Sequence, residues 1–334
     1  MPADFSMPAE WEPHLRTWMC WPCRAEAWDG AAGLAAARRA TADVARAIAT
    51  FEPVTLAVRA DDAQEAAKIC RASGESLPIT LWPVPLDDSW ARDIGPTFVK
   101  RGADRLALQW RFNAWGGKYA PYDKDAAFAA RVAGRAGVPV KPVPLICEGG
   151  AIHSDGQGTL LTTEQCLLNP NRNPGLDRDA VTQILCDATG AARLVWLGEG
   201  FSDTETDGHV DNIACFAAPG RVIVGVPESK EHPDSVAVAQ AVTRLKEAGM
   251  EVIELVQPAT PRRDRQGRPL QQSYVNFYLC NGGLVMPAFD DPNDEKARAL
   301  LADCFPGRHI VAVPALDIVA GGGGIHCITQ QEPA

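Results

Sequence analysis

Short apolar runs separated by turn residues and amphipathic stretches recur along the chain and predict a mixed α/β protein. Strands are predicted at 54–58, 79–84, 96–100, 160–163, 194–197, 210–216, 221–226, 252–256, 274–279, 284–287 and 309–313. Helices are predicted at 61–73, 126–136, 177–188, 234–248 and 292–304. Most of these helices end at or near a glycine, which favours a helix C-terminus.

A second pattern has a longer period. Asp93, Glu148, His209, Asn276 and Cys327 each stand where a polar or reactive residue meets an apolar run, and neighbours in this series are 51 to 67 residues apart. Repetition at this period is typical of a radial or solenoid array of one supersecondary unit. In a radial array the five residues would meet at one central axis, whereas in ordinary α/β alternation the spacing is a coincidence. The pattern leaves both interpretations open.

The composition indicates a globular protein with an acidic balance. Of its 334 residues 46% are apolar and 22% are charged, and the net charge is −10. This charge argues against nucleic acid as a partner and is compatible with a cationic substrate. The first ten residues do not resemble a signal peptide, and no apolar run approaches the ~18 residues of a membrane span. We therefore expect a cytoplasmic protein whose ten cysteines are free thiols.

Cys327 is the candidate nucleophile. It follows four consecutive glycines at 321–324, which permit unusual backbone angles and close approach of a ligand. A loop that meets a packed element in this way gives a nucleophile both access and rigidity. A cationic substrate beside Cys327 would also lower the pKa of its thiol. The alternative is a buried structural thiol.

His209 is the candidate acid and base. It lies in an acidic stretch with Glu205, Asp207 and Asp211, and such a density of carboxylates requires solvent or a cation. The strand predicted at 210–216 would place His209 and Asp211 on one face, because alternate residues of a strand point the same way. The alternative is a core histidine beside a solvated acidic loop.

Two more carboxylates precede apolar runs. Asp93 follows Trp90 and Arg92; the tryptophan could stack on an alkyl chain or a cation, or anchor the turn. If Arg92 pairs with Asp93, the whole group is structural. Glu148 precedes two glycines and is alternatively a turn residue. The C-x-x-C at 20–23 has no second pair, so we expect neither a redox dithiol nor a zinc site there.

Several longer strings in the chain resemble those of the agmatine deiminases, in the guanidine-modifying (pentein) superfamily and its peptidylarginine-deiminase-like branch. The resemblance extends nearly from end to end. The strings are MPAEWEPH at 7–14, WARDIGP at 90–96, FNAWGGK at 112–118, EGG at 148–150, NRNP at 171–174, GHVDN at 208–212, SYVNFY at 273–278 and GGIHCITQQ at 323–331. Together they are specific, although each alone would be modest evidence.

The resemblance implies a fold and an activity. The fold would be a five-bladed α/β propeller with pseudo-fivefold symmetry, built by residues 1–334 as a single catalytic domain of five ββαβ-like repeats around a central active site. The activity would be hydrolysis of agmatine to N-carbamoylputrescine and ammonia in polyamine metabolism, without metal or organic cofactor. Its partners would be a small cationic guanidine and, as in many members of the family, further copies of the chain in a homo-oligomer.

The resemblance also assigns roles to residues. Cys327 would be the nucleophile and would carry a covalent thiouronium intermediate, and His209 would be the general acid and base. Asp93 and Asp211 would hold the guanidinium, and Glu148 would support the histidine.

The remaining assignments concern substrate choice. Glu205 would bind the far end of agmatine, and Trp90 would lie along its alkyl chain. Gly324 departs from the asparagine expected at this place and would add loop freedom. If Arg92 faced the substrate it would favour a carboxylate, and the enzyme would then act on arginine or peptidylarginine. A cysteine amidohydrolase and an acidic polyamine-binding protein are the alternatives from other classes.

Overall fold

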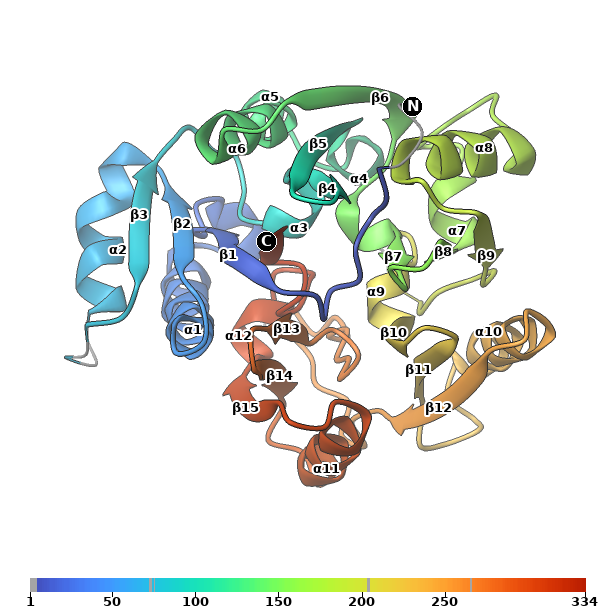
Figure 1. Ribbon diagram of the computed structural model, residues 1–334. Coiled ribbons are helices and arrows are strands. Elements are labelled where there is room, and N and C mark those ends of the chain that lie inside the picture. The colour runs from blue at the N-terminus through green and yellow to red at the C-terminus, as the bar shows by residue number, and fades with distance from the viewer. Residues whose placement is uncertain (1–4, 72–73, 75, 203–204, 265) are drawn as a thin grey trace.

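The strands of the computed structural model form five sheets that surround the middle of the molecule (Figure 1). The structure describes residues 5–71, 74, 76–202, 205–264 and 266–334. Within these ranges four sheets have three strands, and the other has four strands in the order β16-β1-β2-β3. The last strand of the chain therefore pairs with the first, so the two ends of the chain share one sheet.

The strands group by sheet as follows. The four-stranded sheet contains β16 (Thr329–Pro333), β1 (His14–Cys20), β2 (Val54–Val58) and β3 (Ile79–Pro83). The three-stranded sheets are β4 (Thr97–Arg101), β5 (Asp104–Arg111) and β6 (Val140–Ile146); β7 (His153–Ser154), β8 (Thr159–Thr162) and β9 (Arg193–Trp196); β10 (Ala214–Ala218), β11 (Arg221–Val226) and β12 (Glu251–Val256); and β13 (Tyr278–Cys280), β14 (Gly283–Ala288) and β15 (His309–Pro314).

Each three-stranded sheet repeats one arrangement. Its first two strands are antiparallel and its third strand is parallel to the second. A parallel pair needs a crossover connection, and a helix lies in each one. These helices are α6 (Phe128–Ala136), α8 (Arg178–Thr189), α10 (Ser235–Glu247) and α11 (Asp294–Cys304). In the four-stranded sheet the corresponding crossovers contain α1 (Ala31–Ala49) and α2 (Ala63–Cys70).

Shorter helical segments lie in the connections. They are α3 (Ala91–Ile94), α4 (Ala114–Gly117), α5 (Asp123–Ala126), α7 (Glu164–Leu167), α9 (Val210–Ile213), α12 (Leu316–Val319) and the 3₁₀ turns η1 (Ala25–Trp28), η2 (Ala60–Asp62) and η3 (Gly149–Ala151). Of these, α3, η3 and α9 come directly before the first strand of a sheet, and each contains or adjoins a candidate site residue.

Local sequence explains several boundaries. Asp177 precedes α8 and its side chain accepts a hydrogen bond from the Ala180 amide, and the helix ends at Gly190 with φ of 73°. All five residues of β2 are buried. One hydrophobic cluster joins β2 and α1 with β13 and β14, through side chains such as Ile48, Leu56 and Leu284. Adjacent sheets therefore share core, and the loops at their inner ends are held by packed elements on both sides.

Most predicted elements are confirmed, but two predicted strands are wrong in part. Residues 210–213 form the helical turn α9, and β10 begins only at Ala214. Likewise residues 274–277 lie outside any strand, and β13 begins at Tyr278. In both places an apolar run enters the site as a turn before it joins a sheet, which a period-two pattern cannot reveal. The end of the helix predicted at 61–73 includes residues 72 and 73, which lie outside the described residues.

Other expectations concern cysteines and membranes. All ten cysteines are free, and nine of them are buried, whereas Cys186 is half-buried. The prediction of free thiols is thus confirmed. None of the helices in the described part of the chain combines the length and apolar character that a bilayer span requires.

Candidate active site

The five residues of the long-period pattern meet at the middle of the molecule. Asp93, Glu148, His209, Asn276 and Cys327 precede β4, β7, β10, β13 and β16, the first strand of each sheet. A chain of contacts connects Asp93 to His209 and His209 to Glu148, and Asn276 donates to the Cys327 thiol. Asp93 and Cys327 line the same pocket, so the two groups of contacts lie at one site, as the radial interpretation of the pattern requires.

His209 and Asp211 are neighbours in the site, but not for the predicted reason. His209 immediately precedes α9 and Asp211 lies within that turn, so the two residues do not share a strand face. They border the same space because Gly150 has no side chain. A Cβ built on Gly150 would lie 2.6 Å from His209 Nδ1, 2.8 Å from Asp211 Oδ2 and 3.0 Å from Asp93 Oδ1. The three side chains thus pack directly against Gly150, a glycine of η3.

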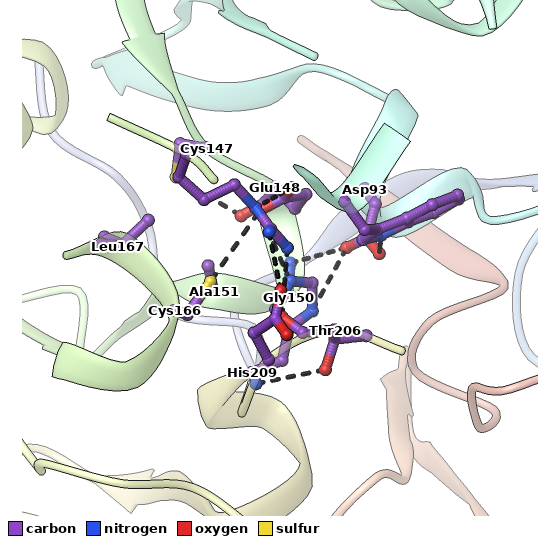
Figure 2. Close-up of polar contacts among 12 residues, drawn as sticks. Asp93, Cys147, Glu148, Gly150, Ala151, Cys166, Leu167, Thr206 and His209 are labelled. Carbon is purple, nitrogen blue, oxygen red and sulfur yellow. Dashed lines mark hydrogen bonds and ion pairs between the residues drawn. The ribbon is translucent and has the colours of Figure 1, made fainter. Parts of the chain in front are cut away.

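One network surrounds His209 (Figure 2). His209 Nδ1 lies 3.8 Å from Asp93 Oδ1 and Nε2 lies 3.5 Å from Glu148 Oε2, and all three side chains are buried. Burial lowers the pKa of His209, but Asp93, Cys166 and Glu148 outweigh it and raise the pKa well above its ordinary value. These neighbours therefore favour the imidazolium form of His209, which can donate a proton.

The two carboxylates of this network, Glu148 and Asp93, accept hydrogen bonds from different donors. The buried Arg172 guanidinium donates from Nε to Glu148 Oε1 at 2.7 Å. Burial raises the pKa of Glu148, but the His209 hydrogen bond and the Arg172 charge lower it overall. Asp93 accepts from Trp115 Nε1 at 2.9 Å and from the Gly150 amide at 3.0 Å. Its pKa is nevertheless raised, because burial outweighs these donors and His209.

A second network surrounds Asp211. Its Oδ2 lies 2.8 Å from His326 Nδ1, and His326 Nε2 lies 2.8 Å from Glu10 Oε1. Burial raises the pKa of Asp211, but the hydrogen bond and charge of His326 and the charge of His209 lower it overall. Asp211 Oδ1 is buried and has no hydrogen-bond partner among the described residues, so it is the oxygen available to a ligand.

Cys327 lies between the two networks. Its Sγ is 3.4 Å from Asn276 Nδ2 and 3.7 Å from Asp211 Oδ2. Burial raises the pKa of this thiol well above its ordinary value, and the charges of Asp211 and Asp93 raise it further. Burial and the two carboxylates therefore favour the thiol over the thiolate, and a cation between the carboxylates would reverse the electrostatic part of this shift.

A small pocket opens above Cys327, with an empty volume of about 300 Å³. Its lining consists of Trp90, Asp93, Trp115, Tyr119, Glu205, Thr206, three of the four glycines and Cys327. Trp90 stacks on Trp28 with ring centroids 5.6 Å apart, which fixes its plane. The Glu205 carboxylate accepts from the Tyr119 hydroxyl at 2.5 Å. The pocket thus presents aromatic faces and two carboxylates.

The four glycines serve packing more than backbone freedom. Only Gly322 among them has a positive φ, 101°. A Cβ on Gly321 would lie 2.3 Å from the Trp28 ring, and a Cβ on Gly323 would lie 2.5 Å from the Trp90 ring. A Cβ on Gly324 would lie 2.3 Å from Asn276 Oδ1, so the expected gain in loop freedom is not the role of this residue. The four glycines therefore allow neighbouring side chains of the site to pack closely against their backbone.

Arg92 does not take either of its expected positions. It is 2% exposed, its Nη1 lies 3.2 Å from Glu10 Oε1, and it is not among the described residues that line the pocket. It therefore neither pairs with Asp93 nor faces a substrate carboxylate. Its ion pair forms because the N-terminal segment that carries Glu10 packs under the site, which the local sequence around Arg92 could not reveal.

Sequence reasoning missed the hydrogen-bond partners that surround the named residues. Trp115 and Arg172 donate to buried carboxylates, and His326 lies between Asp211 and the carboxylate of Glu10. Only their burial in these contacts identifies their roles. Asn276 was found by its spacing and not by its chemistry.

Among the described residues, two groups of side chains have the donor types of a metal site. These are Glu148, Cys166 and His209, and Glu10, His153 and His326, with ligand atoms within 4.8 Å of one another in each group. Their carboxylates already pair with protein cations, Arg172 in the first group and Arg92 and His326 in the second. Both groups are therefore accounted for as ion-pair networks.

Comparisons with known proteins agree with this architecture. A family model for Porphyromonas-type peptidyl-arginine deiminase matches residues 6–333. An agmatine deiminase of Ectopseudomonas mendocina (strain ymp) is 40% identical, across 99% of this chain and 96% of the relative. The solved agmatine deiminase of Enterococcus faecalis has a TM-score of 0.92 and 36% identity, covering 98% of this chain and 96% of that one. A C. jejuni agmatine deiminase solved with substrate bound has a TM-score of 0.89 and 27% identity, with coverages of 99% and 96%.

Proposed function

Because this chain belongs to the Porphyromonas-type peptidyl-arginine deiminase family, we propose that it is an agmatine deiminase, a hydrolase acting on a guanidine C–N bond. It converts agmatine to N-carbamoylputrescine and ammonia. The observation that carries the proposal is the pair of buried carboxylates, Asp93 and Asp211, beside the Cys327 thiol: Asp211 Oδ2 lies 3.7 Å from Sγ, and Asp93 lines the same pocket as Cys327. Full-length similarity to agmatine deiminases supports the choice of substrate.

The carboxylates position the substrate. A planar guanidinium between Asp93 and Asp211 donates charge-assisted hydrogen bonds to both sides, which fixes its plane and keeps its carbon electrophilic. Asp211 Oδ1 supplies one acceptor, and Asp93 supplies another without losing its bond from Trp115. Such positioning can supply about 7 kcal/mol or more of the barrier.

Substrate binding activates the nucleophile. Anionic neighbours raise the pKa of Cys327, and a guanidinium bound between them neutralises their effect. The thiol then passes its proton to solvent water, and the thiolate that remains accepts from Asn276 Nδ2. The nucleophile is thus formed only when a cation is bound.

The reaction follows with one acid and base. Cys327 Sγ bonds to the guanidinium carbon, and imidazolium His209 protonates the departing nitrogen as the C–N bond breaks and ammonia leaves. A thiouronium on Cys327 remains. Neutral His209 then removes a proton from water, whose oxygen bonds to the same carbon, and the C–S bond breaks to give the ureido product. Glu148, held by Arg172, supports His209 in both protonation states.

The pocket favours an amine at the far end of the substrate. Trp90 and Trp115 provide faces for an alkyl chain, and Glu205 provides a carboxylate for an ammonium. Arg92 is committed to Glu10, so it offers no partner to the carboxylate of arginine. This arrangement supports agmatine over arginine.

We further infer that the five sheets are blades of a pseudo-fivefold propeller, the pentein fold, and that residues 1–334 form a single catalytic domain around the site. The repeated strand order and the equivalent positions of the five site residues support this inference. A cytoplasmic location and a homo-oligomeric state stay predictions.

The test measures ammonia and ureido product from agmatine, arginine and a peptidylarginine, each with and without a chelator. We expect product from agmatine, unchanged by chelator. The Cys327→Ala variant should bind agmatine without turnover. Product mainly from arginine would replace the proposed substrate, and turnover by Cys327→Ala would refute the covalent mechanism.

A further inference from the structure

Behind Asp211 lies a buried chain of charged side chains that the reaction above does not use. Asp211 Oδ2 and Glu10 Oε1 each lie 2.8 Å from one ring nitrogen of His326. Arg92 Nη1 lies 3.2 Å from the same Glu10 oxygen. All four side chains are nine-tenths buried or more. The chain therefore leads from the substrate side of the site into the interior, toward the N-terminal segment.

The geometry fixes the protonation of His326. An ionised carboxylate can only accept hydrogen bonds, so a ring nitrogen at this distance from one must carry a proton. Both nitrogens of His326 face carboxylates, and both must therefore donate. His326 is thus an imidazolium, and the two bonds are charge-assisted. Two cations, His326 and Arg92, then balance two anions, Glu10 and Asp211.

Other charged groups also face this chain. Those in contact with or acting on His326 and Asp211 are Glu10, Arg92, His153, His209, Asp93 and Cys327. His153 contacts the other oxygen of Glu10, with Nε2 3.7 Å from Oε2. Of the residues named, His326 is the cation that directly bonds Asp211.

The position of His326 is tied to that of the nucleophile. Its amide donates to Asn276 Oδ1 at 2.9 Å, and its carbonyl accepts from Arg92 Nε at 3.4 Å. The next residue is Cys327, whose carbonyl accepts from the Arg92 amide at 3.1 Å. His326 and Cys327 are therefore held by the same two residues, Asn276 and Arg92, and the imidazolium bonds only one of the two Asp211 oxygens.

We propose that His326 is a positioning residue for the deiminase reaction: held by Glu10, it binds Asp211 Oδ2 and leaves Oδ1 as the oxygen that receives the guanidinium. His326 acts through Asp211 and does not touch the substrate. It keeps Asp211 ionised in a buried site and sets the distance between that carboxylate and Cys327. The inference rests on the proposed function of the site.

Two substitutions of His326 test its two hydrogen bonds one at a time. The amide nitrogen of asparagine is as many bonds from Cα as histidine Nδ1, and that of glutamine is as many bonds as Nε2. His326→Asn therefore keeps a donor for Asp211, and His326→Gln keeps a donor for Glu10. Both remove the charge. His326→Phe removes both donors, and His153→Asn is the control because it changes a histidine of the same cluster away from Asp211.

The experiment measures kcat and KM for agmatine from pH 5 to 10, with thermal melting as a check on folding. We expect kcat/KM to fall by about 10-fold in His326→Asn and about 100-fold in His326→Gln and His326→Phe, since a lost bond to a charged group has effects of this size. Without the cation Asp211 protonates more easily, so the acid limb of kcat/KM moves to higher pH in all three. His153→Asn keeps the wild-type limb.

The outcomes distinguish the inference from the function on which it rests. If the wild type releases no ammonia from agmatine, the proposed function fails first. If the wild type is active but His326→Asn is no better than His326→Gln, or the acid limb stays in place, His326 is structural and the inference is overturned. Should His326→Phe fail to fold, the comparison of the asparagine and glutamine variants still decides.

Discussion

Asp93 and Asp211 are the same residue type, are both buried and act on the same thiol, yet the pKa of Asp93 is raised and that of Asp211 is lowered. Burial raises the pKa of both carboxyl groups. Asp211 bonds an imidazolium at 2.8 Å, whereas the nearest imidazole nitrogen to Asp93 is 3.8 Å away and further anions oppose it. Because both side chains are buried, the difference between their pKa shifts comes from their neighbouring charges and hydrogen-bond partners.

The difference gives the two sides of the pocket different tasks. The Asp211 side is balanced before substrate arrives, because its network already contains two cations. The Asp93 side has a carboxyl group that burial disfavours as an anion, and a guanidinium relieves this penalty when it binds. Asp93 therefore contributes mainly to binding of the cation, and Asp211 contributes mainly to its orientation.

The largest expected effect comes from neutralising either carboxylate. Asp93→Asn and Asp211→Asn should each lower kcat/KM for agmatine about 10³-fold, the size expected when one partner of a buried charge pair is removed. Asp93→Asn should also lower the pKa of His209, since Asp93 is the largest of the influences that raise it. The alkaline limb of the pH–rate profile should therefore move to lower pH in Asp93→Asn. Steady-state rates across pH measure both effects.

Asp155→Asn is the matched control, because Asp155 is a buried carboxylate that accepts turn amides outside the site. It should leave kcat/KM and both limbs unchanged. Near-normal turnover by Asp93→Asn would favour a cysteine amidohydrolase, which needs only one orienting carboxylate.

The same two variants should change stability in opposite directions. Asp211 has a lowered pKa in the fold, so its ionised form stabilises the protein at neutral pH and this contribution is lost as pH falls. Asp93 has a raised pKa, so its ionised form destabilises the fold at neutral pH. Asp211→Asn should cost about 3–5 kcal/mol of unfolding free energy. Asp93→Asn should increase it at pH 7, and denaturant unfolding that gives equal losses would contradict this assignment.

A smaller loss is expected from a methyl group placed between the two sides. Gly150→Ala would put a Cβ within 3.0 Å of Asp93, His209 and Asp211, so at least one must move. A displacement of this kind costs about 10²-fold in kcat. Gly134→Ala is the control: Gly134 lies in α6 with nothing near its missing Cβ, and the change should stabilise the protein by up to about 1 kcal/mol without loss of activity. Unchanged kinetics in Gly150→Ala would show that the site is looser than its contacts indicate.

The sequence predicted the residues that recur with the long period, but not the partners that surround them. The long-period pattern found Asp93, Glu148, His209, Asn276 and Cys327, because equivalent positions in a radial repeat share a place in the fold. It could not find the partners that set their charges, since these come from segments with no fixed relation to the repeat. Glu10 lies before β1 and joins His326 across 316 residues of chain.

The fold was predictable to a similar degree. Amphipathic helices such as α8 and α10 were found from their periodicity and end signals. The alanine-rich α1 and the strands β1, β5 and β6 were not predicted; β6 contains two prolines that weaken any strand pattern. The sequence predicts a strand at α9 because Val210 and Ile213 are apolar and continue into β10; both are buried in the hydrophobic cluster that also contains β10 and β11.

The reactivity of Cys327 should report the two carboxylates separately. Burial, Asp211 and Asp93 raise the pKa of its thiol, so inactivation by iodoacetamide should be slow at pH 8 and should still increase above pH 9. Both asparagine variants should react faster at pH 8, Asp211→Asn more than Asp93→Asn, by about tenfold for each unit by which the pKa falls. Equal rates in all three proteins would mean that burial alone sets the pKa.

The smallest expected effect lies at the far end of the pocket, where one carboxylate is less buried than Asp93 and Asp211. Glu205→Gln should raise KM for agmatine about 5-fold to 10-fold with little change in kcat, because a partly exposed ion pair contributes about 1 kcal/mol. Tyr119→Phe, which keeps the Glu205 charge and removes only the hydroxyl bonded to it, should have a smaller effect. Butylguanidine, which lacks the terminal amine of agmatine, should bind both variants with the same affinity as it binds the wild type. A loss of kcat in Glu205→Gln with butylguanidine would instead place Glu205 with the carboxylates that organise the reacting carbon.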